Sequence, residues 1–138
     1  MSVSYEISVL PTHVLVQATG SYELADAMHL VREALATANS HKQPKILVDA
    51  RKVTGNLSMM QRFEFGDAVA KLYSQRPHGS AALIAVVGNE PLIDPERFGE
   101  TVAVNRAVPV KVSTDMQEAL DWLNIQSTQA EGKPRDSK

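Results

Sequence analysis

The sequence predicts an α/β protein with a mixed sheet of about five strands and helices packed on it, in the order ββαβαβαβα. Three observations carry this prediction. Ile46–Val48 and Ala81–Val87 are apolar almost throughout, as parallel strands covered on both faces are. Apolar residues recur at helical spacing between these segments. The N-terminal region instead alternates apolar and polar residues, which is typical of a half-buried hairpin.

The N-terminal hairpin is expected from two alternating segments, Tyr5–Leu10 and Val14–Thr19, with a hairpin-sized break between them. A helix is expected next, because apolar residues recur at helical spacing at Leu24, Met28, Val31 and Leu35. This helix must end before Pro44, since proline disfavours helical geometry in the residue that precedes it.

A second helix is expected between the two apolar strands, from about Met59 to Gln75. One face is formed by Met59, Phe63, Gly66, Ala70 and Tyr73, and it is broadened by Phe65, Val69 and Leu72. Four residues at the start of this helix, Met59, Met60, Phe63 and Phe65, could line an apolar pocket, since methionine adapts to varied ligands. We favour the simpler interpretation, in which Met59, Met60, Phe63 and Phe65 belong to the core.

The C-terminal part is expected to contain a helix that begins at Asp94-Pro95-Glu96, with Asp94 as its cap. Val108–Val112 predicts a short strand, and Pro109 places it at or near a sheet edge. Thr114–Gln117 has the spacing of a capping box and opens a last helix, with Met116, Leu120 and Leu123 facing inward. Residues 126–138 are polar, so we expect a single domain over 1–125 and a disordered tail.

Composition narrows the classes of function. The chain has 138 residues, a formal charge of −2 and no cysteine, which excludes disulfides, thiolate zinc sites and a cysteine nucleophile. The small net charge argues against nucleic-acid binding. No apolar segment is long enough to cross a bilayer, and the N-terminal residues do not resemble a secretory signal. A cytoplasmic protein is the expectation.

The stretch Lys45–Arg62, KILVDARKVTGNLSMMQR, marks the expected functional site. It is interpreted as a buried strand that ends at a carboxylate, a short basic loop and the start of a helix. In parallel sheets, ligands and partners usually meet the protein at such a junction. The candidate partner- or ligand-binding residues are Asp49, Arg51, Thr54, Gly55, Ser58 and Arg62.

Each candidate has a structural alternative. Asp49 is an acid or acceptor at a crevice, or a carboxylate that bonds its own backbone or pairs with an arginine, which we favour. A phosphate on Thr54 or Ser58 would meet the positive end of the helix dipole. Ser58 is more simply an N-cap, because Ser58–Gln61 has capping-box spacing. Arg62 either reaches the crevice or lies on a solvated helix face.

Catalytic patterns are not recognised in the sequence. The four histidines are far apart and lack carboxylates at ligand spacing, so no metal site is expected. Gly88–Pro91 has a single glycine and is not a phosphate-binding loop of the glycine-rich kind. No pairing of a nucleophile with a base is recognised, and no cofactor is expected. We therefore do not expect an enzyme.

The chain resembles the SpoIIAA-like branch of the STAS domain family. The resemblance rests on the element order, on DARKVTG leaving the third strand, on NRAVPVKV before the last strand and on EALDWL closing the domain. It covers roughly Tyr5 to Leu123 and implies a regulatory or binding module, as in bacterial anti-sigma-factor antagonists and anion transporters. Those antagonists carry a phosphorylatable serine or threonine in an Asp-Ser-Ser/Thr-Gly sequence. Here Ala50 and Arg51 follow Asp49, and the only hydroxyl–glycine pair is Thr54-Gly55.

Two hypotheses follow. The first is a non-enzymatic regulatory module that contacts a protein partner through the segment from Asp49 to Arg62. The second is a carrier or sensor of a small apolar or lipid-like ligand, held between the sheet and the helix that begins at Met59. A homodimer formed through the expected edge near Val108–Val112, or through the N-terminal hairpin, is compatible with both.

Overall fold

The computed structural model describes residues 2–76, 82–94, 101 and 108–125. Its elements, in chain order, are β1 (Val3–Val9), β2 (Val14–Ser21), α1 (Leu24–Ser40), β3 (Lys45–Thr54), α2 (Met59–Ser74), β4 (Leu83–Val87), β5 (Val110–Ser113) and α4 (Met116–Leu123). The helix expected to begin at Asp94-Pro95 and the tail expected over residues 126–138 lie outside the described residues.

The described strands form one five-stranded sheet in the order β1-β2-β3-β4-β5. β1 pairs antiparallel with β2, as the predicted hairpin requires, and the β2–β3, β3–β4 and β4–β5 pairs are all parallel. The predicted mixed sheet is therefore confirmed. β1 and β5 are its two edge strands, so both edges considered for self-association are edges of the described sheet.

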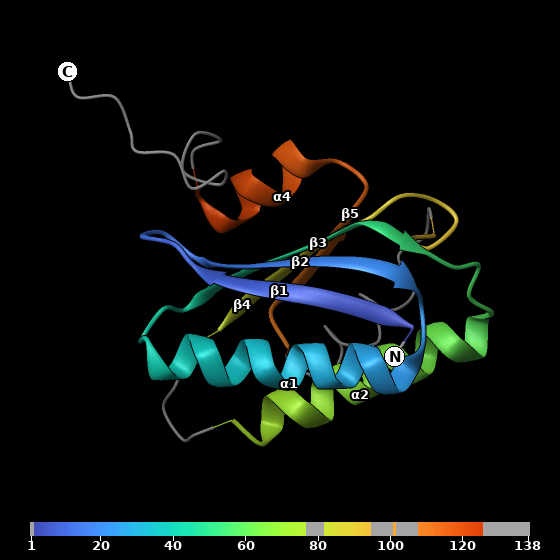
Figure 1. The fold of residues 1–138 in the computed structure, drawn as a ribbon, viewed down its shortest axis with the longest axis horizontal. Coiled ribbons are helices and arrows are strands. Elements are labelled where there is room, and N and C mark those ends of the chain that lie inside the picture. The colour runs from blue at the N-terminus through green and yellow to red at the C-terminus, as the bar shows by residue number, and fades with distance from the viewer. Residues whose placement is uncertain (1, 77–81, 95–100, 102–107, 126–138) are drawn as a thin grey trace.

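The helices cover the two faces of the sheet unequally. α1 and α2 lie side by side on one face, and α4 is the described helix on the other (Figure 1). The larger apolar core lies on the α1–α2 side and includes Ile46 and Val48 of β3. Leu47, between them, belongs to the smaller core beneath α4. The apolar run of β3 is therefore buried on both faces, as expected for a central parallel strand.

The third strand is longer than the sequence predicts. It does not end at Val48, because the backbone continues to pair with β2 as far as Thr54, opposite Ser21. Between Asp49 and Lys52 the register shifts, since β3 has one more residue there than β2 has between Gln17 and Thr19. The segment interpreted as a basic loop is therefore mostly strand.

The second helix has the predicted position, but its predicted inward face is partly wrong. The buried residues of α2 are Gly66, Ala68, Val69, Ala70 and Leu72. Met59 and Met60 are instead 71% and 65% exposed, and Phe63 is 39% exposed. The buried residues all lie at or after Gly66, so the first turn of α2 extends beyond the core.

The last helix begins one residue later than the capping-box spacing suggests. Its N-cap is Asp115, whose Oδ1 accepts a hydrogen bond of 2.9 Å from the Gln117 backbone N–H. Leu120 and Leu123 are buried and Met116 packs against them, as predicted. This side of the helix fixes α4 on β4 and β5 and leaves the β1–β3 half of the same face without a described helix above it.

Candidate functional site

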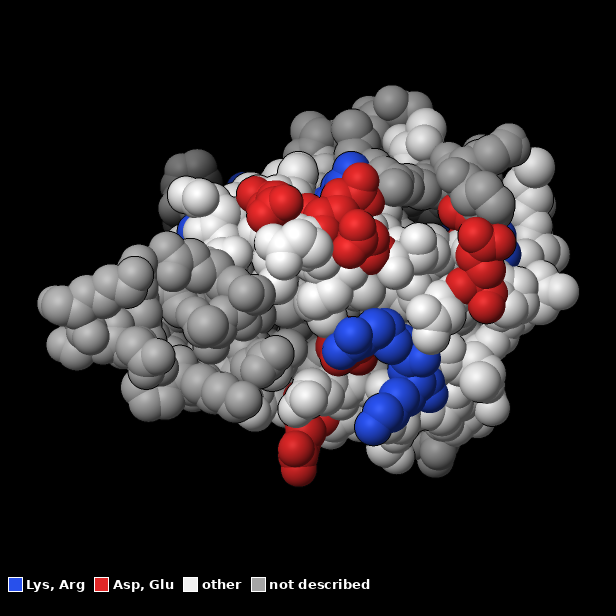
Figure 2. All heavy atoms as spheres, turned by 90° about the horizontal axis from the view of Figure 1, so that it is seen from above, with Lys and Arg blue, Asp and Glu red and all other residues white. Residues whose placement is uncertain are grey.

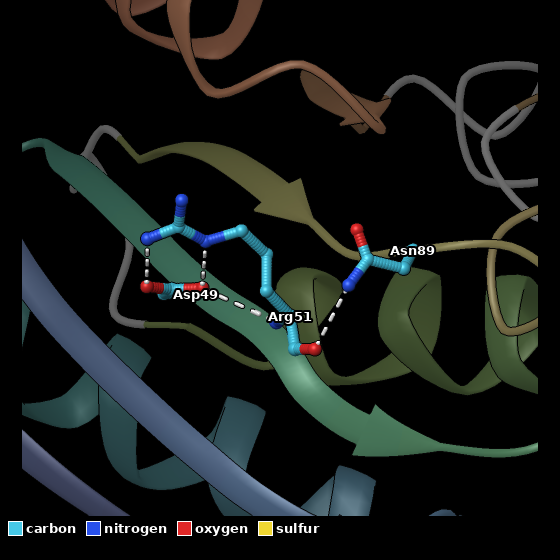
Figure 3. A network of polar contacts seen from close by, with 3 residues as sticks. All are labelled: Asp49, Arg51 and Asn89. Atoms are coloured by element: carbon cyan, nitrogen blue, oxygen red, sulfur yellow. Dashed lines mark hydrogen bonds and ion pairs between the residues drawn. The ribbon is translucent and has the colours of Figure 1, made fainter.

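Asp49 and Arg51 form an ion pair on the α4 face of β3. Arg51 Nε donates to Asp49 Oδ1 at 2.9 Å and Nη2 donates to Oδ2 at 2.8 Å (Figure 3). The Arg51 backbone N–H donates to the same carboxylate at 3.2 Å. Asp49 does not end its strand, contrary to the prediction, but the favoured interpretation that it pairs with an arginine is confirmed.

Arg51 favours the ionised form of Asp49, chiefly through its hydrogen bonds. Partial burial acts to raise the pKa of Asp49, but the hydrogen bonds and charge of Arg51, together with the charge of Lys52, outweigh it and hold the pKa below its usual value. The same hydrogen bonds raise the pKa of Arg51. The carboxylate is therefore ionised near neutral pH, and both of its oxygens already accept hydrogen bonds from Arg51. This arrangement does not suit a general base.

The register shift beside this pair decides which side chains face which side of the sheet. Ala50 and Val53 are both buried on the α1–α2 side, although residues three positions apart in a regular strand point to opposite faces. The extra residue turns the strand, and a bulge commonly has this effect. Asn89, in the turn after β4, donates from Nδ2 to the Arg51 backbone oxygen at 3.1 Å (Figure 3).

The ion pair borders an open hollow of about 600 Å³ on the α4 face. Basic and acidic side chains lie next to one another on this face (Figure 2). The described residues that line the hollow come from the hairpin, from β3 and from α4: Ser8, Leu10, Leu15, Gln17, Leu47, Asp49, Arg51, Met116, Gln117 and Leu120. Its charged lining residues are Asp49 and Arg51, which neutralise each other.

Thr54 and Gly55 lie at the C-terminal end of β3. Thr54 is exposed, and its hydroxyl donates to the Gly20 backbone oxygen at 3.2 Å. Its backbone oxygen accepts from the Tyr22 N–H at 2.9 Å, which ties the strand end to the segment after β2. A Cβ at Gly55 would lie 3.1 Å from Tyr22 Cβ and 3.2 Å from Leu57 Cδ1. Gly55 therefore allows a close approach of these side chains.

Ser58 caps α2, as its spacing from Gln61 predicts. The Gln61 backbone N–H donates to Ser58 Oγ at 3.1 Å, and the Ser58 backbone N–H donates to Gln61 Oε1 at 2.7 Å. The two bonds form a complete capping box. Ser58 is nevertheless exposed, so its hydroxyl is accessible from solvent.

Arg62 is neither on a solvated face nor free to bind a ligand. Its side chain is only 12% exposed, with Nη1 donating to the Leu92 backbone oxygen at 2.7 Å and Nη2 to that of Pro91 at 2.9 Å. Nη1 also lies 3.6 Å from Asp94 Oδ1. The guanidinium therefore fixes the turn after β4 against α2, and the interpretation of Arg62 as a solvated residue is wrong.

The six candidate residues do not form one cluster. Asp49 and Arg51 lie on the α4 face, whereas Arg62 lines a cavity on the α1–α2 side. Thr54, Gly55 and Ser58 connect the two along the β3–α2 junction. Arg51 and Arg62 therefore do not converge on the entrance of α2, because each guanidinium bonds groups on its own side of the sheet.

Sequence reasoning missed the exposed apolar residues at the start of α2. Five large hydrophobic side chains are exposed in the described part of the chain, and three of them, Met59, Met60 and Phe63, lie within one five-residue segment. The others are Val9 and Trp122. We call Thr54, Gly55, Ser58, Met59, Met60 and Phe63 the α2-start surface. Their exposure depends on how α2 packs against the sheet, and no local pattern in the sequence indicates it.

An apolar cavity of about 110 Å³ lies between the sheet and the helices α1 and α2. Tyr22 lines it, and its buried hydroxyl oxygen has no hydrogen-bond partner among the described residues. Burial, together with the charge of Glu64, raises the pKa of Tyr22 to about 12. The hydroxyl is therefore protonated at neutral pH.

The described ranges contain neither a metal-binding cluster nor a helix that could span a membrane. Within them, no group of three or more histidine, aspartate or glutamate side chains is arranged to hold a metal ion. No described helix combines the length and apolar character needed to cross a bilayer.

Comparison with known proteins supports the fold. No protein-family model matches the sequence, and no curated protein does. An anti-sigma factor antagonist from Mycobacterium paratuberculosis superposes with a TM-score of 0.56 and 15% identity, over 89% of this chain and 95% of that one. An uncharacterised protein from Shewanella loihica with a SpoIIAA-like fold superposes with a TM-score of 0.45 and 21% identity, over 88% and 93%. The chain therefore has the SpoIIAA-like STAS fold that its sequence resembles.

Proposed function

We propose that this chain is a non-enzymatic regulatory module that binds a protein partner through the α2-start surface. The exposure of Met59, Met60 and Phe63 is the observation that carries the proposal. Grouped exposed apolar side chains mark interaction sites in soluble proteins. Methionine and aromatic residues are also enriched in protein interfaces.

The fold supports a regulatory role for this surface. The solved structure with the same fold and a TM-score of 0.56 is an anti-sigma factor antagonist, which acts on a protein. The α2-start surface also lies at the C-terminal end of β3, where proteins with parallel sheets commonly meet their ligands. The proposal narrows the site predicted from the sequence, because Asp49 and Arg51 bond to each other and Arg62 bonds to the turn after β4.

Two exposed hydroxyls give this surface a means of control. Thr54 and Ser58 flank the loop that leads into α2. A phosphate on Ser58 would stand at the helix N-terminus, where negative charge is favoured, and next to two apolar side chains. Modification at Ser58 would therefore leave α2 folded and change the chemistry of the proposed interface. Lys52, which is exposed on β3, is the nearest cation in sequence to Thr54.

Partner capture from a native lysate tests the proposal with matched variants. The test protein carries Met60→Ser and Phe63→Ser, and the control carries Trp122→Ser, which removes an exposed apolar side chain from the opposite face. We expect a partner that wild type and the Trp122→Ser protein retain and the double variant loses. Equal capture by all three proteins, with all three equally folded by circular dichroism, would refute the α2-start surface as the interface.

A further inference from the structure

The apolar cavity between the sheet and α1–α2 is separate from the α2-start surface, since its described lining includes none of the six residues of that surface. The lining is almost entirely aliphatic and aromatic. It includes Leu30 of α1, Ala50 and Val53 of β3, Phe65 of α2 and Leu92 of the turn after β4. The cavity volume of about 110 Å³ is large enough for more than one water molecule, because one water needs only about 10–15 Å³ by the same measure.

One polar atom in this apolar lining has no hydrogen-bond partner among the described residues. Tyr22 lines the cavity, and its ring meets that of Phe65 edge-on, with centroids 6.4 Å apart. Its hydroxyl is buried and unpaired among the described residues, whereas buried polar atoms are nearly always hydrogen-bonded. Since the hydroxyl retains its proton at neutral pH, it is a hydrogen-bond donor for which the described part of the chain supplies no acceptor.

The charged residues of the described lining oppose a charged ligand. They are Arg62 and Asp94, which lie 3.6 Å apart, and Arg62 also donates to two backbone oxygens of the adjoining turn. A charged guest would enter an apolar site without a free counter-ion, which is costly. A neutral guest does not incur this cost of burying an unpaired charge.

We propose that this cavity binds a small neutral molecule with an apolar body and one oxygen that accepts a hydrogen bond from Tyr22. The volume indicates its size, because an engineered cavity of about 150 Å³ binds benzene, and about 110 Å³ here suits a guest of about six non-hydrogen atoms. The sequence suggested a small apolar ligand between the sheet and the helix that begins at Met59. The proposal specifies the cavity that holds it, its approximate size and the hydroxyl that it bonds. The proposal does not depend on the protein partner.

Two isosteric probes test the anchor. Cyclopentanone carries a carbonyl where methylenecyclopentane carries a CH₂ group, so the two differ mainly in their ability to accept a hydrogen bond. Methyl resonances of Leu30 and Val53, followed by NMR titration, report occupation of the cavity. We expect both probes to bind saturably and only the ketone to depend on the Tyr22 hydroxyl. Tyr22→Phe should weaken the ketone roughly 2- to 12-fold, the value of one net hydrogen bond, and leave methylenecyclopentane unchanged.

Two further variants control the experiment. Tyr5→Phe removes a hydroxyl that bonds Glu33 outside the cavity, and it should leave both affinities unchanged. Ala50→Val places two methyl groups into the cavity from β3 and should weaken both probes together. Failure of both probes to shift the Leu30 and Val53 methyls would mean that the cavity holds water only, and would overturn the proposal. Equal ketone affinity in wild type and Tyr22→Phe would also overturn it.

Discussion

Arg51 holds the carboxylate of Asp49, two residues earlier on the same strand, by two side-chain hydrogen bonds of 2.9 and 2.8 Å and one backbone hydrogen bond of 3.2 Å. The two side chains point to the same face of β3 because they are two positions apart. The sequence suggested a charged binding site at these residues, but in the structure their charges pair with each other.

Replacing Asp49 with Asn should have a small effect on stability. The Arg51 side chain is 48% exposed, so solvent screens the pair, and we expect a loss of at most about 1 kcal/mol in the free energy of unfolding at pH 7. Urea denaturation of wild type and Asp49→Asn measures it. A loss of several kcal/mol would contradict the view that this pair is local and screened.

The same pair predicts the direction of an acid effect. The folded pKa of Asp49 is lower than its ordinary value of 3.8, so its contribution is present above pH 3.8 and is lost as the pH falls through the folded pKa. Asp49→Asn should therefore lose less stability than wild type between pH 4 and pH 2. Parallel stability curves for the two proteins over this interval would be inconsistent with the pair.

His13 should make the fold sensitive to milder acid. The side chain is fully buried, with Nδ1 bonded to Thr12 Oγ1 at 2.8 Å and Nε2 unpaired among the described residues. Burial, and then the charge of Lys45, lower the pKa of His13 below its ordinary value of 6.5. Below pH 6.5, His13 therefore binds a proton in the unfolded chain but not in the folded chain. The free energy of unfolding falls as the pH drops from 6.5 to the folded pKa.

Urea denaturation at pH 7.5 and pH 5.0 checks the prediction for His13. His13→Gln should lose less stability between these two values than wild type. His41→Gln, which replaces an exposed histidine, should behave as wild type does. A wild-type protein equally stable at both pH values would show that His13 is not held neutral.

Ser58→Ala should destabilise the protein by about 1 kcal/mol, because it removes the side-chain acceptor of the Gln61 N–H at the start of α2. Ser58→Asp should retain most of the stability, since aspartate also caps helices and its charge suits the N-terminus. Thermal denaturation of the three proteins tests this order. If Ser58→Asp were as unstable as Ser58→Ala, a phosphate at this position would be hard to reconcile with a folded α2.

Arg62→Met should cost about 2 kcal/mol or more. The change leaves the Pro91 and Leu92 oxygens without their guanidinium donors, while methionine retains the aliphatic contacts. Hydrogen exchange should rise at Ile93, whose backbone N–H bonds Asn89 within the same turn. Lys71→Met, which removes an exposed cation from the same helix, is the matched control. Unchanged exchange at Ile93 would show that Arg62 does not fix this turn.

The order of elements was predictable because hydrophobic periodicity reports burial directly. Ile46–Val48 could be recognised as a central strand because its consecutive residues enter the cores on both faces. The end of β3 could not be recognised in the same way. Asp49, Arg51 and Lys52 are charged, and charged residues indicate exposure to solvent but do not show where a strand ends. Continued pairing with β2, which is a tertiary contact, keeps them in the strand.

The candidate site was harder to predict than the fold. Ser58 was recognisable as a cap because both members of the capping box are local in sequence. The partners of Arg62 lie about thirty residues away, in the turn after β4, so no local pattern identifies them. The exposure of Met60 and the cavity at Tyr22 depend on how α2 meets the sheet, which neither segment encodes alone.

Site-specific photo-crosslinking tests the proposed interface most directly. A photoreactive phenylalanine analogue is placed at Met60 in one protein and at Trp122 in another, and both are irradiated in a native lysate. Both positions are exposed and lie on opposite sides of the sheet. The proposed function predicts a discrete covalent adduct with one protein from position 60 and none from position 122. An adduct from position 122 alone, or the same adducts from both, would contradict it.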